Sequence, residues 1–140
     1  MFPAPFHLHE ATYEEMIAYC KQKLPNEACG LISGPIGAEI GLTLWKLSNE
    51  AKKPDRFLLS KPAVAEVLEK MKQQGEQLTG IFHSHPTTEA YPSVTDIAYN
   101  PYPEVAYIIV SLAAPSPVVR CFTMKNNEVR SLELVFFRSD

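Results

Sequence analysis

Cysteine is scarce in this sequence, and long apolar stretches are missing. The three cysteines, Cys20, Cys29 and Cys121, are an odd number, and none of them forms a Cys-x-x-Cys pair. This usage argues against a framework of disulfides and predicts a reducing compartment, the cytoplasm. No apolar run approaches the roughly 18 residues that a membrane-spanning helix needs, so we expect no membrane partner.

The sequence has no basic excess, and we expect no secretory leader. The chain has 13 Lys and Arg against 16 Asp and Glu, a net charge of −3, so nucleic acid is not an expected partner. Residues 1–5 show neither the charged region nor the apolar region of a signal peptide. No repeat or linker interrupts the sequence, and its hydrophobic fraction of 46% is sufficient for a core. We therefore expect residues 1–140 to form a single domain.

The hydrophobic pattern predicts an α/β protein. We expect two main helices, one over residues 12–24 that begins with a capping box at Thr12, and one over residues 61–74 that is capped by Ser60. Strands are expected at residues 6–9, 26–35, 40–47, 56–59, 78–85, 105–112, 118–124 and 128–135. The expected fold is a curved, mixed β-sheet flanked by these two helices and by a short third helix.

The residues that carry chemistry are concentrated between His83 and Asp96. His83 and His85 stand two apart at the end of an apolar strand, so both imidazoles leave the same face and can bind one metal ion. Ser93 follows Pro92 and predicts the N-cap of a short helix, with Asp96 at the third helical position. This helix can return Asp96 to the histidines. Three protein ligands with one open position are typical of a catalytic zinc site.

Each part of this pattern also has a simpler explanation. An isolated His-x-His pair is usually structural, Ser-x-x-Asp is often only a helix cap, and an acid at the start of a strand, such as Glu27, is commonly just exposed. The combination favours catalysis, with Glu27 as the general base for a zinc-activated water. The oxygen of Ser93 can cap the helix while its proton stabilises a developing oxyanion.

Two other features are less promising as functional sites. The second pair, His7 and His9, is expected to be structural or solvated, because no acid follows it at a helix start. Cys29 could lie near the site if its strand is regular, but a buried, small hydrophobic role is favoured.

The complete pattern is Glu27, then His83-x-His85, seven residues, and Ser93-x-x-Asp96. It resembles the JAMM (MPN-plus) metalloprotease motif at every position and spacing, and the resemblance extends over nearly the whole chain. It implies the JAMM/MPN fold, which is cytidine-deaminase-like. It also implies one Zn²⁺ per chain bound by His83, His85 and Asp96, with Glu27 as acid and base and Ser93 supporting the oxyanion. Metallo-β-lactamase-like hydrolases need an Asp where position 87 is Thr, and barrel amidohydrolases need about 250 residues.

The resemblance also implies a class of substrate. Members of this family cleave peptide or isopeptide bonds at the C-terminus of ubiquitin-like proteins. The segment 49–55 is too short for the insertions with which eukaryotic deubiquitinases grip ubiquitin, and the run 56–62 resembles standalone prokaryotic members that process sulfur carriers with a Gly-Gly tail. The expected partner is such a carrier, from which cysteine or a peptide is released. A zinc peptidase or amidase for another small peptide and a non-catalytic MPN-type scaffold remain alternatives, and the oligomeric state is not predicted.

Overall fold

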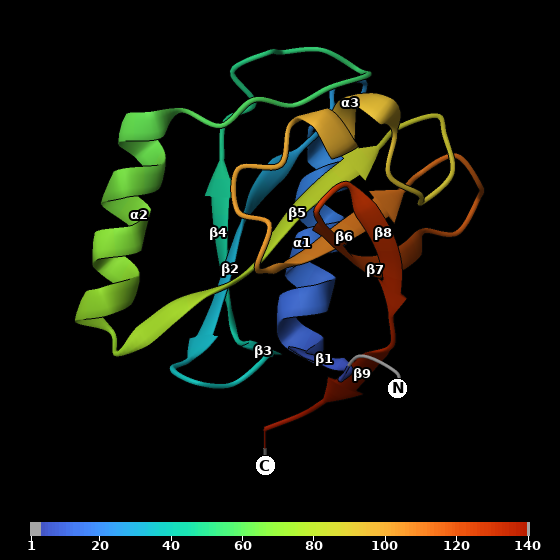
Figure 1. Ribbon diagram of the computed structural model, residues 1–140. Helices are drawn as coiled ribbons and strands as arrows, with labels where there is room; N and C mark the ends of the chain where they lie inside the picture. Colours follow the sequence, from blue (N-terminus) through green and yellow to red (C-terminus); the bar gives the residue numbers. More distant parts are fainter. Residues whose placement is uncertain (1–3, 140) are drawn as a thin grey trace.

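The computed structural model describes residues 4–139, which form a mixed α/β fold (Figure 1). The elements are β1 (Phe6–His9), α1 (Glu10–Gln22), β2 (Cys29–Pro35), β3 (Ile40–Gly41), β4 (Thr43–Leu47), α2 (Lys61–Gln73), β5 (Glu76–His85), α3 (Val94–Ala98), β6 (Ala106–Ser111), β7 (Val118–Lys125), β8 (Glu128–Leu132) and β9 (Leu134–Phe137). No helix within these described residues is long and apolar enough to cross a membrane. Residues 1–3, part of the segment in which no signal peptide is expected, lie outside the described residues.

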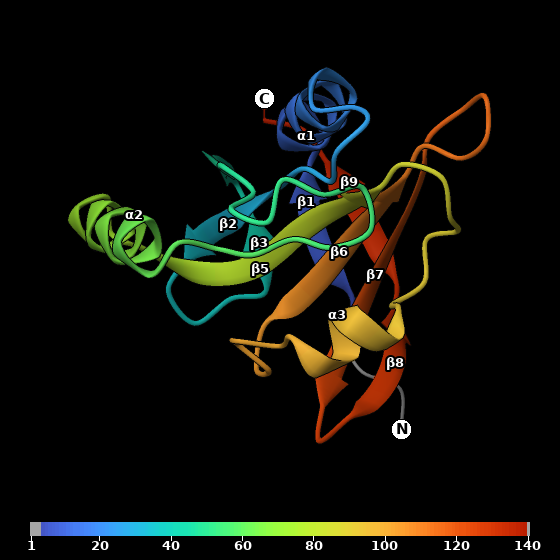
Figure 2. The same cartoon turned by 90° about the horizontal axis from the view of Figure 1, so that it is seen from above.

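Six strands form the central mixed sheet, in the order β4-β2-β5-β6-β7-β8. Its parallel pair is β5 with β6, and the other neighbours are antiparallel. A smaller sheet has the order β3-β1-β9, with both pairs parallel. Figure 2 shows α1 on one side of the central sheet and α3 on the other. The predicted mixed sheet with two main helices and a short third one is therefore observed.

Each face of the central sheet has its own core, because neighbouring residues on a strand point to opposite faces. Phe82 of β5 packs with Met16 and other side chains of α1. Ile81, its neighbour, packs on the other side with Val67 and other side chains of α2. By the same alternation, His83 follows Ile81 and leaves the sheet on the face that α2 and α3 cover.

Four expected elements differ from those observed. α1 begins at Glu10 with His9 as its N-cap, because the Thr12 hydroxyl donates to the carbonyl of Leu42 rather than capping the helix. The expected strands 40–47 and 128–135 are each divided, because β3 and β9 pair with β1 in the smaller sheet. Residues 56–59 form no strand.

A close approach between β2, β4 and β5 requires glycine at position 30. A Cβ on Gly30 would collide with the backbone carbonyl of Trp45 and with the ring of Phe82. We expect Gly30→Ala to lower the free energy of unfolding by about 1–3 kcal/mol, measured by urea denaturation. Gly80→Ala is the matched control, because its Cβ would lie no closer than 3.4 Å to another atom. Equal stability of both variants would contradict this explanation.

Candidate metal centre

The end of β5 lies next to α3 (Figure 1). Three side chains converge there. The His83 Nε2 atom lies 3.1 Å from His85 Nε2 and 3.1 Å from Asp96 Oδ2, and His85 Nε2 lies 2.9 Å from the same oxygen. All three side chains are buried, with exposed fractions of 0%, 3% and 2%. The structure thus brings together the three predicted ligand residues, and their ligand atoms could hold a metal ion.

The hydrogen bonding of the His85 ring favours a cation at this point. Its Nδ1 lies 2.8 Å from the carbonyl oxygen of Glu89. A carbonyl only accepts, so Nδ1 carries a hydrogen, and the neutral ring directs the lone pair of Nε2 at Asp96. Although burial opposes it, the contact with Asp96 and the Glu89 carbonyl raise the pKa of His85, so its surroundings favour positive charge at this ring.

Asp96 and His83 each favour the protonation state of a metal ligand. Burial opposes ionisation of Asp96, but the contacts with the two histidines and the hydrogen bond from the Ser93 backbone N–H together hold its pKa below the usual range. Burial lowers the pKa of His83, which therefore favours the neutral, ligand form. Because metal binding requires neutral imidazoles and a carboxylate, these groups are in or near the protonation states of a ligand set.

Ser93 fixes Asp96 by a reciprocal cap. The Ser93 Oγ accepts the backbone N–H of Asp96 at 3.0 Å, and the Asp96 Oδ2 accepts the backbone N–H of Ser93 at 2.9 Å. This is the predicted capping box at the start of α3. The Ser93 hydroxyl hydrogen is not used in the cap, so it is available to a group at the centre.

Glu27 lies two residues before β2, the strand that pairs with β5. Cys29 pairs with His83 in the antiparallel register, and the Ser84 N–H donates to the Ala28 carbonyl at 3.0 Å, which continues the pairing beyond β2. This register sets Glu27 opposite His85. The Glu27 side chain is 3% exposed, and its Oε1 atom has no hydrogen-bond partner among the described residues. Burial, helped by the charge of Asp96, raises its pKa to about 8.

His83 is held in an unusual way for a ligand histidine. Its Nδ1 atom is buried and has no hydrogen-bond partner within residues 4–139. Instead, the ring of Phe57 stacks on the imidazole, with 4.5 Å between centroids and 24° between planes. Sequence reasoning missed Phe57, because one aromatic in a short apolar run gives no sign of where its ring will pack.

The other candidate residues have structural environments. His9 caps α1 by accepting the Ala11 N–H at Nδ1, and its Nε2 contacts the Ser139 hydroxyl at 2.7 Å. Cys29 is fully buried in the core on the α2 side. Burial, followed by the charge of Glu27, raises its pKa to about 12, so it remains a thiol.

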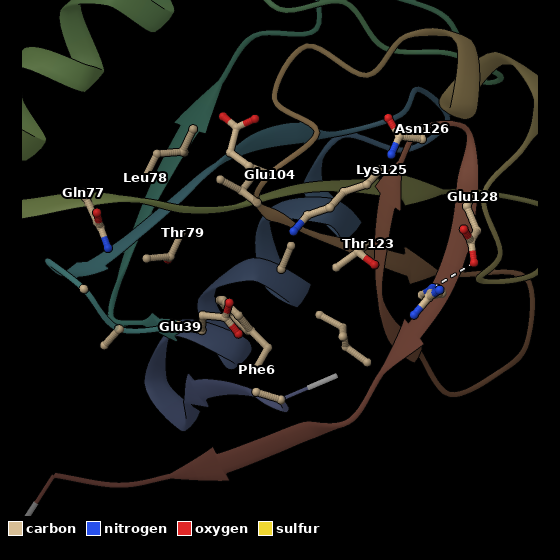
Figure 3. Close-up of a pocket in the computed structure, with 17 residues that line it drawn as sticks. Phe6, Glu39, Gln77, Leu78, Thr79, Glu104, Thr123, Lys125, Asn126 and Glu128 are labelled. Atoms are coloured by element: carbon tan, nitrogen blue, oxygen red, sulfur yellow. Dashed lines mark hydrogen bonds and ion pairs between the residues drawn. The ribbon is translucent and has the colours of Figure 1, made fainter. Parts of the chain in front are cut away.

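Two hollows lie outside this centre. One of about 640 Å³ is at the opposite end of β5 and β6, where Thr79, Glu104 and Lys125 line it (Figure 3). A smaller one of about 340 Å³ lies between the loop that follows His85 and the start of β7, with Glu89 and Arg120 in its walls. Neither contains any of the five predicted site residues.

Comparison with known proteins defines the class of this chain. A family model described as prokaryotic homologs of the JAB domain matches residues 9–125. The chain therefore belongs to this JAB-domain family, which confirms the resemblance suggested by the sequence motif.

Relatives with names of their own support the assignment. A CysO-cysteine peptidase of Mycobacterium tuberculosis is 33% identical over 100 residues, which cover 71% of this chain and 68% of that protein. A desampylase of Haloferax volcanii is 31% identical over 88 residues, which cover 62% and 63%.

Solved structures confirm the fold. A Desulfitobacterium hafniense protein, known from a solution structure, is 33% identical and superimposes with a TM-score of 0.88, over 96% of this chain and 94% of that one. A JAB1/MPN domain protein from Archaeoglobus fulgidus shares the fold at 21% identity, with a TM-score of 0.61 over 93% and 99% of the two chains.

Proposed function

We propose that residues 1–140 form a zinc-dependent metallopeptidase domain that hydrolyses an amide bond at the Gly-Gly C-terminus of a ubiquitin-like sulfur carrier. The observation that carries the proposal is the convergence of His83, His85 and Asp96, together with the buried Glu27 carboxyl, whose Oε1 atom has no hydrogen-bond partner among the described residues. The names of the M. tuberculosis and H. volcanii relatives support this substrate class.

The donor set fits zinc. Two imidazole nitrogens and one carboxylate oxygen are ligands that Zn²⁺ accepts, and bonds of about 2.0–2.1 Å in a tetrahedron separate neighbouring ligand atoms by about 3.3 Å. The three separations here are 3.1, 3.1 and 2.9 Å. His83, His85 and Asp96 would hold the ion, one per chain. When bound, zinc supplies a positive charge that polarises a carbonyl and acidifies water.

Glu27 performs the proton transfers in this proposal. Its carboxylate removes a proton from the attacking water as the new C–O bond forms at the scissile carbonyl. The same group then gives this proton to the leaving nitrogen as the C–N bond breaks, so the products are a carboxylate and a free amine. The pKa of about 8 is close to neutral pH, where one group can both accept and release a proton efficiently.

Ser93 supports the oxyanion while it caps α3. We expect Ser93→Ala to reduce kcat by about 10²–10³-fold through loss of the hydroxyl donor, and to cost about 0.5–2 kcal/mol through loss of the cap. Ser93→Gly separates the two roles, because glycine at an N-cap costs only about a few tenths of a kcal/mol relative to serine. Steady-state kinetics and thermal melts would measure both; a Gly variant with the wild-type kcat would show that the hydroxyl only caps.

The substrate is tested with a defined carrier. CysO extended by one C-terminal cysteine is incubated with the zinc-loaded protein, with and without a chelator, and the products are weighed by mass spectrometry. We expect release of cysteine after Gly-Gly, abolished by the chelator. Cleavage of unrelated short peptides but not of the carrier would indicate a different zinc peptidase. Absence of all hydrolysis by the zinc-loaded protein would leave a scaffold role. The three buried, free cysteines of the described residues support a reducing, cytoplasmic setting for this reaction.

A further inference from the structure

The segment between β4 and α2 arches over the end of the sheet at which β5 ends (Figures 1 and 2). We call residues 49–59 of this segment the strap. Its backbone forms no strand or helix. The strap is therefore not held over the metal centre by the hydrogen bonds of regular secondary structure.

One side chain of the strap, Asn49, makes four hydrogen bonds. Its Nδ2 donates to the carbonyl of Glu27 at 3.1 Å and to the carbonyl of Arg56 at 3.0 Å. Its Oδ1 accepts the backbone N–H groups of Ala51 and Leu58, both at 3.0 Å. A carboxamide offers two donors and two acceptor lone pairs, so every hydrogen-bonding position of Asn49 is used.

Three of the partners of Asn49 are Glu27 itself and the two neighbours of Phe57. Arg56 and Leu58 lie immediately before and after Phe57, so the amide brackets the residue that stacks on His83. Its remaining donor binds the backbone of Glu27. The Asn49 side chain thus connects the backbone of Glu27 to the neighbours of Phe57, whose ring stacks on the imidazole of His83.

Stacking on Phe57 takes the place of a hydrogen bond at Nδ1 of His83. A ligand histidine usually donates its second ring N–H to a carbonyl or carboxylate, which fixes the orientation of the ring. His85 has such a partner in the Glu89 carbonyl, whereas Nδ1 of His83 has none among the described residues. The flat ring of Phe57, itself only 5% exposed, stacks on the His83 imidazole and so limits its rotation.

We propose that Asn49 is a positioning residue. Its side chain holds the backbone of Glu27 and, through Phe57, the ring of His83 in fixed positions relative to each other. The four hydrogen bonds of its side chain all go to backbone groups of the chain. The expected effect of Asn49 on turnover rests on the proposed function, whereas its expected effect on the geometry of the metal site does not. Backbone hydrogen bonds also hold the strap, among them Glu27 N–H to the Lys53 carbonyl and Glu50 N–H to the Leu58 carbonyl, but neither of these bonds by itself joins Glu27 to the neighbours of Phe57 as the Asn49 side chain does.

The test uses Asn49→Asp, which keeps both acceptor contacts and loses both donations. We expect kcat for the CysO–cysteine substrate to fall about 10–100-fold, the usual effect of losing an outer contact of a metal site, while KM changes less than about threefold. We also expect weaker zinc binding and an altered visible spectrum of the Co²⁺-substituted protein, which reports ligand geometry. Phe57→Leu, which keeps apolar bulk without a flat ring, should alter the same cobalt spectrum.

Ser60→Ala is the matched control. It removes the N-cap of α2 just beyond the strap, where Ser60 Oγ accepts the Ala63 N–H, and leaves the contacts of Asn49 intact. It should lower Tm without changing kcat or the cobalt spectrum. The inference is overturned if Asn49→Asp, measured well below its Tm, keeps the wild-type cobalt spectrum and zinc affinity, or if Phe57→Leu leaves that spectrum unchanged. If the wild type cleaves no carrier, the proposed function fails, and the cobalt and zinc measurements still decide the role of Asn49.

Discussion

Glu27→Gln is expected to abolish hydrolysis and, at the same time, to stabilise the metal-free protein. Glutamine has nearly the same shape but cannot accept the proton of the attacking water, and loss of a positioned general base typically costs about 10²–10⁴ in rate. Zinc binding should persist, because the three ligand side chains are unchanged. Single-turnover kinetics of the zinc-loaded variant and its metal content by elemental analysis would measure both effects.

The stability effect follows from the burial of the Glu27 carboxyl. Its pKa is raised from 4.5 to about 8, so the folded state binds this proton more tightly than the unfolded state does. The contribution of this carboxyl to the free energy of unfolding is fully present below its ordinary pKa of 4.5 and is lost as pH rises through about 8. Glutamine stays neutral and so avoids the cost of ionising a buried carboxyl, and at pH 8 the Gln variant should therefore melt higher than the wild type.

The control for this prediction is the difference between the two proteins across pH. In the presence of chelator, their Tm values should approach each other below pH 4.5 and diverge toward pH 8. A Gln variant that hydrolyses the carrier as fast as the wild type would remove Glu27 from the mechanism. Parallel pH curves would show that its carboxyl is not desolvated.

Asp96→Asn is expected to eliminate zinc binding at micromolar metal and all detectable hydrolysis. Asp96 is the only anionic member of the group that could hold the ion, and its Oδ2 contacts both imidazoles. Asparagine can still accept the Ser93 backbone N–H with its side-chain oxygen, so the cap of α3 is retained. The variant therefore removes charge from the centre without removing the helix start.

Thermal melts with and without zinc would measure the loss. A ligand that binds only the folded state stabilises it by RT ln(1 + [L]/Kd), about 2.7 kcal/mol at a hundredfold excess over Kd. Zinc should raise the Tm of the wild type and of Thr95→Ala, an exposed neighbour on α3, but not that of Asp96→Asn. An equal zinc-induced shift in all three proteins would place the metal elsewhere.

The sequence alone was sufficient for the parts of the site that are close in the chain. His83 and His85 share a face because strand geometry requires it at a separation of two. Ser93 and Asp96 form their capping box because the local backbone of a helix start brings them together. The helix at Lys61–Gln73 and its Ser60 cap were also predictable, since a cap and an apolar stripe are local signals.

The tertiary structure alone decided the contacts between distant segments. That Glu27 faces His85 follows from the β2–β5 register, which depends on how two strands pack across more than fifty residues. Residues 56–59 have the composition of a strand. Their backbone groups instead form hydrogen bonds with the side chain of Asn49, so these residues are part of the strap. The stacking of Phe57 on His83 has no local signal at all, because side-chain packing between separate segments is fixed only when the whole fold is complete.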